Sequence, residues 1–167
     1  MARERGWVAL LEARLKQERL DYSVVNASIS GDTSGGARAR FGPLLAKHRP
    51  AIVVLELGGN DGLRGLPVTQ MRSNLSAIIN ESQTAGARVL LVGVRLPPNY
   101  GEVYTGAFEA AYRELAKTHR VALVPFILED FAGNPEYFQA DRLHPNEQAQ
   151  QLMLDRVWSG LKPLLHR

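Results

Sequence analysis

Four short runs of apolar residues, rich in valine and isoleucine, recur along the chain and predict β-strands. Each run is long enough for a strand and shorter than an ordinary helix. Apolar runs without polar alternation are typical of strands that are buried on both faces of a parallel sheet. The predicted strands are residues 22–29, 51–57, 87–94 and 121–127.

Between these runs, apolar residues recur every three or four positions, which predicts amphipathic helices. The predicted helices are residues 6–20, 36–48, 68–85, 104–119 and 145–164. Alternation of helix and strand predicts an α/β fold, here a flavodoxin-like three-layer α/β/α sandwich with a parallel sheet. Ligands of such folds bind beyond the carboxyl ends of the strands. We therefore expect the functional residues in the loops that follow the four strands.

Composition narrows the class of protein. With 167 residues, 45% of them hydrophobic and 22% charged, the chain is expected to form a single folded domain, residues 1–167. The net charge is only +3 and the basic residues are scattered, so no nucleic-acid partner is expected. The sequence contains no cysteine, which excludes disulfides and thiolate chemistry. No apolar run is long enough for an integral membrane segment.

The loop after the second predicted strand, Leu57-Gly58-Gly59-Asn60-Asp61-Gly62, is the first candidate site. Its glycines allow a sharp turn close to a ligand, and the amide of Asn60 can donate a hydrogen bond to a developing oxyanion. The alternative is a turn built from turn-forming residues.

The segment Asp141-Arg142-Leu143-His144-Pro145-Asn146 is a stronger candidate. A carboxylate three residues before an imidazole can fix its tautomer and leave the second ring nitrogen to act as a base. Pro145 suits the first position of a helix, so we expect His144 at a helix start. The alternative makes both residues ordinary loop residues.

The other histidines, His48, His119 and His166, fall near predicted helix ends or at the tail, where a cation suits the helix dipole. No two histidines have the spacing of metal ligands. We therefore expect no metal.

Taken together, the segments resemble the SGNH (GDSL) hydrolases, in the branch of the arylesterases, acyl-CoA thioesterase I and lysophospholipases. Four segments carry the resemblance in order: V-V-N-A-S-I-S-G-D-T-S, L-E-L-G-G-N-D-G-L-R-G, R-L-P-P-N-Y-G and D-R-L-H-P-N. The resemblance implies that Gly31 and Asn60 are oxyanion-hole donors. It also implies that His144 is the general base and that Asp141 orients it.

The nucleophilic serine of the family lies in a G-D-S motif after the first strand, and this sequence has no such motif. The segment Gly31-Asp32-Thr33-Ser34 matches the family's second motif instead, so Thr33 and Ser34 are expected to cap the next helix. The resemblance thus implies that the first, central strand of the SGNH fold is missing from this chain. Loss of four or five buried apolar residues would cost on the order of 10 kcal/mol.

Three explanations stay open. The first is that the recorded start is too late and that the natural protein continues upstream through the strand and the G-D-S motif. The second is a non-catalytic relic that binds esters or lipids. The third is a replacement nucleophile among Ser28, Ser30, Thr33 and Ser34. A flavodoxin-like nucleotide binder would share the alternation, but the chain has neither G-x-G-x-x-G nor G-x-x-x-x-G-K-[ST].

For the intact enzyme, the resemblance implies hydrolysis of a small ester, thioester or lysophospholipid through an acyl-enzyme, with no cofactor. The chain as written is expected to be inactive. It also implies a periplasmic or secreted location, although the N-terminus has no signal peptide and a chain produced as written would be cytoplasmic. Acyl-chain length, ester versus thioester preference and oligomeric state stay open. The residues expected to shape the acyl pocket are Leu63, Arg64, Leu66, Pro97, Asn99 and Tyr100.

Overall fold

The computed structural model describes residues 6–166. Its contacts divide the chain into two compact units, one formed by Ala27–Phe126 and the other by the residues on either side of it. Within the described part of the chain, no helix combines the length and the apolar character needed to cross a lipid bilayer.

A parallel three-stranded sheet forms the centre of the unit Ala27–Phe126. The strands β1 (Ile52–Glu56), β2 (Arg88–Val92) and β3 (Ala122–Val124) are arranged in the order β1-β2-β3. Leu91 of β2 is paired with Leu55 on one side and with Leu123 on the other. The last four residues of β2 are buried, as expected of a central strand.

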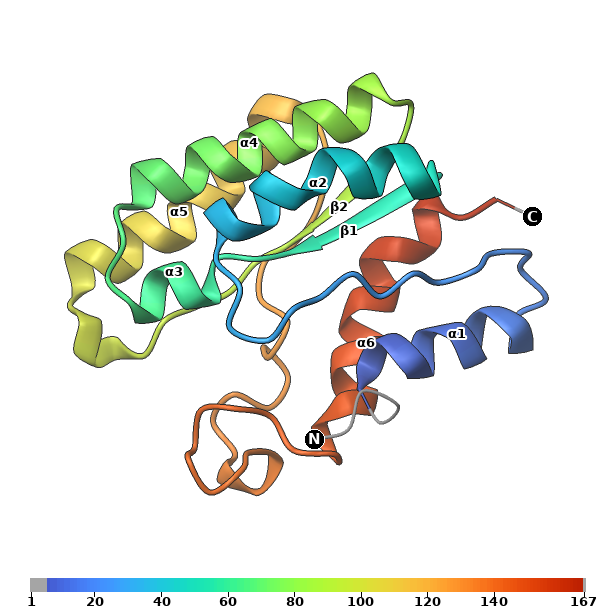
Figure 1. The fold of residues 1–167 in the computed structure, drawn as a ribbon. Helices are drawn as coiled ribbons and strands as arrows, with labels where there is room; N and C mark the ends of the chain where they lie inside the picture. Colours follow the sequence, from blue (N-terminus) through green and yellow to red (C-terminus); the bar gives the residue numbers. More distant parts are fainter. Residues whose placement is uncertain (1–5, 167) are drawn as a thin grey trace. The chain divides into compact units, whose positions relative to one another are not determined.

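Helices of the same unit cover one face of this sheet (Figure 1). They are α2 (Ser34–His48), α4 (Val68–Thr84) and α5 (Glu102–His119), with a short α3 (Gly59–Leu63) and the 3-10 turn η2 (Pro98–Tyr100) at loop positions. The core between helices and sheet contains Leu75 and Ile79 of α4, Leu91 of β2 and Phe108 and Tyr112 of α5, each at most 1% exposed. This packing gives the loops after β1 and β2 a rigid base.

The second unit contains α1 (Trp7–Gln17), the 3-10 turn η3 (Pro135–Tyr137), α6 (Ala149–Leu161) and the 3-10 turn η4 (Lys162–Leu164). α1 packs on α6. The Arg14 guanidinium binds the Asp155 carboxylate at 2.6 Å and lies 4.7 Å from the centre of the Trp158 ring. A long loop, residues 127–148, precedes α6.

The α/β class with a parallel sheet is confirmed, as are the strands predicted at residues 51–57, 87–94 and 121–127, within a few residues at each end. The helices predicted at residues 6–20, 36–48, 68–85 and 104–119 are also present. The five-residue α3, which the sequence pattern did not predict, replaces part of the expected turn.

The strand predicted at residues 22–29 is wrong. The segment is extended, but it pairs with no strand among residues 6–166. Val25 and Ile29 are 54% and 55% exposed, whereas the pattern predicted burial on both faces. An apolar, β-branched run favours an extended backbone, but a strand forms only where a neighbouring strand accepts hydrogen bonds from its N–H groups and donates to its C=O groups.

The predicted start of the last helix is also wrong. α6 begins at Ala149, and Pro145 instead forms an isolated antiparallel bridge with Phe138. Proline tolerates this position because it has no N–H to satisfy. His144 therefore lies in a hairpin before the helix.

Candidate functional site

Residues 137–146 form a small hairpin, which we call the Asp–His hairpin. The Gln139 N–H donates to the His144 carbonyl at 2.8 Å, and the Asn146 N–H donates to the Tyr137 carbonyl at 2.8 Å. Arg142, with φ of +55°, makes the turn between the two arms. The turn brings Asp141 and His144 to the same side of the hairpin.

The Asp141 carboxylate binds His144 through both of its oxygens. Oδ2 lies 2.7 Å from the His144 Nδ1, and Oδ1 accepts the backbone N–H groups of Leu143 and His144 at 2.9 and 3.0 Å. The hydrogen bond from the imidazole, followed by those two backbone N–H groups, lowers the pKa of Asp141 to about 2. The Asp141 side chain is 48% exposed and that of His144 is 63% exposed. An Nδ1 held by a carboxylate directs Nε2 outward as a proton acceptor.

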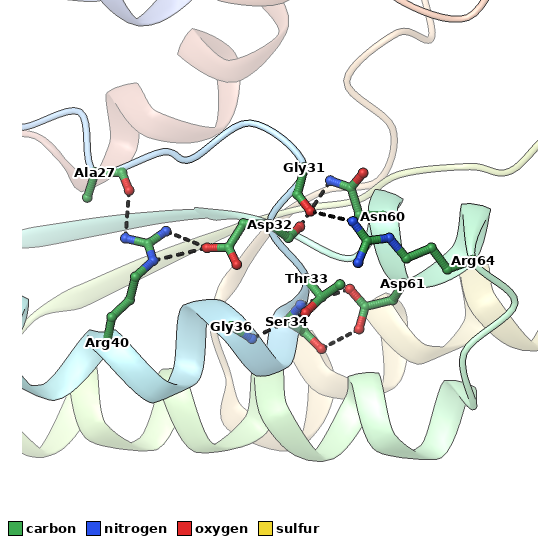
Figure 2. A network of polar contacts seen from close by, with 10 residues as sticks. All are labelled: Ala27, Gly31, Asp32, Thr33, Ser34, Gly36, Arg40, Asn60, Asp61 and Arg64. Atoms are coloured by element: carbon green, nitrogen blue, oxygen red, sulfur yellow. Dashed lines mark hydrogen bonds and ion pairs between the residues drawn. The ribbon is translucent and has the colours of Figure 1, made fainter.

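Gly31 and Asn60, the two predicted oxyanion donors, lie together in the unit Ala27–Phe126 (Figure 2). Gly31 has φ of +78°, a conformation that favours glycine. The Asn60 Nδ2 donates to the Asp32 carbonyl at 3.0 Å, and the Arg64 Nη2 donates to the Gly31 carbonyl at 3.0 Å. Two side chains of the loop after β1 thus hold the backbone of the turn at Gly31.

A buried polar network connects the same two loops beneath that turn, and the sequence analysis did not predict it. The Asp61 carboxylate accepts the Ser34 N–H at 2.8 Å and the Ser34 hydroxyl at 2.5 Å, and the Asn74 Nδ2 donates to the Ser34 Oγ at 3.1 Å (Figure 2 shows the Ser34–Asp61 part). The exposed fractions are 0% for Ser34, 3% for Asp61 and 8% for Asn74. The only sequence signal for this network is position: Asp61 follows the predicted donor Asn60, and Ser34 comes three residues after the predicted donor Gly31.

The prediction that Thr33 and Ser34 cap the next helix is correct for Thr33 alone. The Thr33 Oγ1 accepts the Gly36 N–H at 3.2 Å, at the start of α2. Ser34 is the first residue of that helix and gives its hydroxyl to Asp61 instead. Neighbouring Asp32 forms an ion pair with Arg40 at 2.7 Å.

Gly58, the first of the two glycines before Asn60, is required by its surroundings, whereas a Cβ at Gly59 would make only an ordinary contact with Val94. Gly58 has φ of +112°, and a Cβ at this position would collide with the Tyr112 hydroxyl and lie 2.7 Å from the Met71 sulfur. The Tyr112 hydroxyl donates to the Leu57 carbonyl at 2.6 Å. Burial, then the negative charges of Asp61 and Glu56, raise the pKa of Tyr112 well above its usual value. The tyrosine therefore stays a neutral donor that holds the end of β1.

Two of the residues predicted to line the acyl pocket, Leu63 and Tyr100, are in direct contact, and Leu66 contacts a third residue, Tyr104. The Tyr100 hydroxyl donates to the Leu63 carbonyl at 3.0 Å, and the Tyr104 hydroxyl donates to the Leu66 carbonyl at 2.6 Å. The sequence did not predict the contact of Tyr104 with Leu66. Arg64 faces Gly31 instead, and Pro97 and Asn99 lie at the η2 turn. Asp141 and His144 belong to the other unit.

His48 and His119 lie where the sequence predicted them, in the last turns of α2 and α5. The His119 Nε2 lies 2.8 Å from the Ser76 hydroxyl. In residues 6–166, no three His, Asp, Glu or Cys side chains gather closely enough to hold a metal ion.

Comparison with known proteins agrees with the resemblance seen in the sequence. A family model described as "GDSL-like Lipase/Acylhydrolase family" matches residues 2–152. Esterase TesA of Pseudomonas aeruginosa is 53% identical over 160 residues, which are 96% of this chain and 80% of the relative. Thioesterase 1/protease 1/lysophospholipase L1 of Escherichia coli is 43% identical over 166 residues, 99% of this chain and 78% of the relative. A crystal structure of TesA matches with a TM-score of 0.96 at 52% identity, covering 99% of this chain and 92% of that one. The chain therefore belongs to the GDSL-like lipase/acylhydrolase family, a family of carboxylic ester and thioester hydrolases.

Proposed function

We propose that this chain carries the acid–base pair and two oxyanion donors of a serine ester hydrolase that acts on small carboxylic esters, thioesters or lysophospholipids. His144 is the general base, Asp141 orients it, and the Gly31 N–H and the Asn60 amide stabilise the oxyanion. The observation that carries the proposal is the 2.7 Å contact between the Asp141 Oδ2 and the His144 Nδ1. It selects the tautomer in which Nε2 accepts a proton.

The reaction proceeds in two steps. A serine hydroxyl attacks the acyl carbon while its proton moves to the His144 Nε2, and the alkoxide or thiolate leaving group then takes that proton, which leaves an acyl-serine. In the second step water attacks the acyl carbon and gives a proton to the same nitrogen. The acid is released as His144 returns the proton to the serine. No metal or cofactor enters either step.

Oxyanion stabilisation requires donors that are fixed before the reaction. A side-chain amide has two N–H donors, and Asn60 uses one of them to bind the Asp32 carbonyl, so the bond that orients Asn60 leaves the second available. The left-handed backbone of Gly31, held through its carbonyl by Arg64, orients the other proposed donor.

The sequence contains no G-D-S motif, and we propose that none of its 167 residues is the nucleophilic serine. Ser34, three residues after Gly31, is fully buried and gives its hydroxyl to Asp61, and the Thr33 hydroxyl caps α2. Both contacts argue against a replacement nucleophile at these positions. They favour, as a second candidate, a non-catalytic protein that binds esters or lipids. We propose that the chain as given does not turn over esters.

The substrate class is proposed from the names of the relatives, which include an esterase, a thioesterase and a lysophospholipase. The residues proposed to line the acyl pocket remain Leu63, Arg64, Leu66, Pro97, Asn99 and Tyr100. A periplasmic or secreted location stays a prediction.

A gain-of-function experiment tests the proposal. A segment with the family's first strand and G-D-S motif is fused in front of residue 1, and hydrolysis of p-nitrophenyl butyrate is measured. We expect turnover that is lost in His144→Ala and in a Ser→Ala variant of the added motif. His119→Ala is the matched control and should keep turnover. A folded fusion that binds the ester without turnover would support the non-catalytic alternative.

A further inference from the structure

The Asp–His hairpin is too small to hold its shape without an anchor. A two-stranded hairpin is only marginally stable in water. Here its arms share the Gln139–His144 and Tyr137–Asn146 backbone bonds, both 2.8 Å long, and a bond of 3.1 Å from the Gln139 Nε2 to the Pro145 carbonyl. A contact to the rest of the unit must therefore fix the direction in which the His144 ring points.

The buried Phe131 ring packs on Tyr137 and Phe138 of the hairpin, and Asn146 makes a polar contact with both ends of its side-chain amide. Its Nδ2 donates to the Glu136 carbonyl at 2.6 Å, in the segment that leads into the hairpin, and more weakly to the Phe138 carbonyl at 3.4 Å. Its Oδ1 accepts the N–H groups of Gln148 and Ala149 at 3.0 and 3.3 Å, at the start of α6. A single side chain thus joins the incoming arm of the hairpin to the helix.

The connection continues into the helix pair. The Gln150 side chain is 4% exposed; its Nε2 donates to the Asn146 carbonyl at 3.0 Å, and its Oε1 accepts the Trp7 N–H at 3.0 Å. Buried hydrogen bonds of this kind are costly to break, because each lost partner leaves a desolvated polar group. The hairpin is thereby tied through Asn146 to α6 and through Gln150 to α1.

From this geometry we infer that Asn146 is a positioning residue, which fastens the Asp–His hairpin to α6 and so keeps the Asp141 carboxylate and the His144 imidazole in contact. The inference rests on the proposed function only in giving His144 the role of general base. It assigns to Asn146 two separable tasks, helix capping through Oδ1 and fastening of the hairpin through Nδ2. Serine can take over the first task but has no side-chain N–H at the required reach for the second.

The test is the NMR titration of the Asp141 carboxyl group in the full chain, with hydrogen exchange of the Leu143 and His144 amides measured alongside. In Asn146→Ser, we expect the pKa of Asp141 to rise by about 1 unit from about 2, because the hydrogen bonds that favour its ionised form become loose. The two amides should exchange at least about ten times faster, since their acceptor is no longer held in place. The matched control is Asn134→Ser, at a residue of the same loop whose Oδ1 accepts the Glu136 N–H at 3.0 Å; it should leave both readouts unchanged.

Asn146→Asp is the second variant. It retains a capping oxygen, adds a charge that favours a helix N-terminus and removes the Nδ2 donors. Faster exchange of the Leu143 and His144 amides, with α6 intact by circular dichroism, is the expected result. Slow exchange in both Asn146 variants, with the pKa of Asp141 unchanged in Asn146→Ser, would overturn the inference and leave Asn146 as a helix cap. Neither readout requires turnover, so failure of the proposed hydrolase function would be seen separately, in the ester assay.

Discussion

The two groups of candidate site residues, one in each unit, are built in different ways. Asp141 and His144 are three residues apart and exposed, and the side-chain bonds within their hairpin join residues no more than ten positions apart. Gly31 and Asn60 instead rest on a buried network whose bonds join residues 27 to 40 positions apart, such as Ser34 with Asp61 and with Asn74. The first group depends on local chain geometry, whereas the second depends on the packing of a whole unit. Mutations in the first group should therefore change mainly the Asp141–His144 contact, whereas mutations in the second should lower the stability of the fold.

The largest effect on stability is expected from Asp61→Ala. It removes the acceptor of two buried donors, the Ser34 N–H and hydroxyl, and each unsatisfied group costs about 1–3 kcal/mol. We expect the free energy of unfolding to fall by about 3–5 kcal/mol in urea denaturation followed by circular dichroism. Asp141→Ala, the same substitution in the exposed hairpin, should lower the free energy of unfolding much less, because the carboxylate that it removes is half exposed to water. Equal losses in both variants would contradict the distinction between the two groups of residues.

Gly58→Ala should have the next largest effect, about 2–4 kcal/mol, because it adds backbone strain at φ of +112° to a collision with Tyr112. Gly65→Ala is the control: its φ is +64°, but no atom lies within 4 Å of the added Cβ. Only the strain of about 1–3 kcal/mol should remain there. The comparison of the two midpoints separates packing from strain, and a larger loss at Gly65 would contradict the account.

Thr33→Ala should cost about 1 kcal/mol, the usual contribution of a helix cap, since the Gly36 N–H loses its acceptor. Thermal unfolding measures this loss. Thr33→Ser retains a capping hydroxyl and should recover most of the stability. If serine does not recover it, the threonine contributes through its methyl group instead.

The smallest effect on stability is expected from His144→Ala, but it should change the titration of Asp141. The pKa of Asp141 is lowered from 3.8 to about 2, so the ionised carboxylate stabilises the folded state above pH 3.8 and this contribution is lost as the pH falls toward about 2. His144→Ala removes the largest cause and should move the pKa toward 3.8, while the two backbone N–H groups keep it below that value. An unchanged pKa by carboxyl NMR would mean that the two side chains are not in contact in solution.

The sequence predicted those features that depend on neighbours in the chain. The Asp141–His144 contact follows from a spacing of three residues, and most helices follow from apolar periodicity. It did not predict the Ser34–Asp61–Asn74 network, because nothing local shows that an aspartate after β1 will meet a serine of α2. The strand prediction for residues 22–29 is wrong for the same reason, since pairing depends on a partner strand. The prediction of a helix start at Pro145 is wrong because proline suits both a helix start and a hairpin arm. The single-domain organisation of residues 1–167 stays a prediction.

The central claim is that this chain provides the base and the oxyanion donors of an ester hydrolase without its nucleophile. The most direct test is hydrolysis of p-nitrophenyl butyrate by the 167-residue chain, compared with its His144→Ala variant at equal concentration. We predict that the two proteins release p-nitrophenol at the same slow rate as buffer with an unrelated folded protein. Turnover by the chain that disappears in His144→Ala would contradict the claim and place a working nucleophile within these residues.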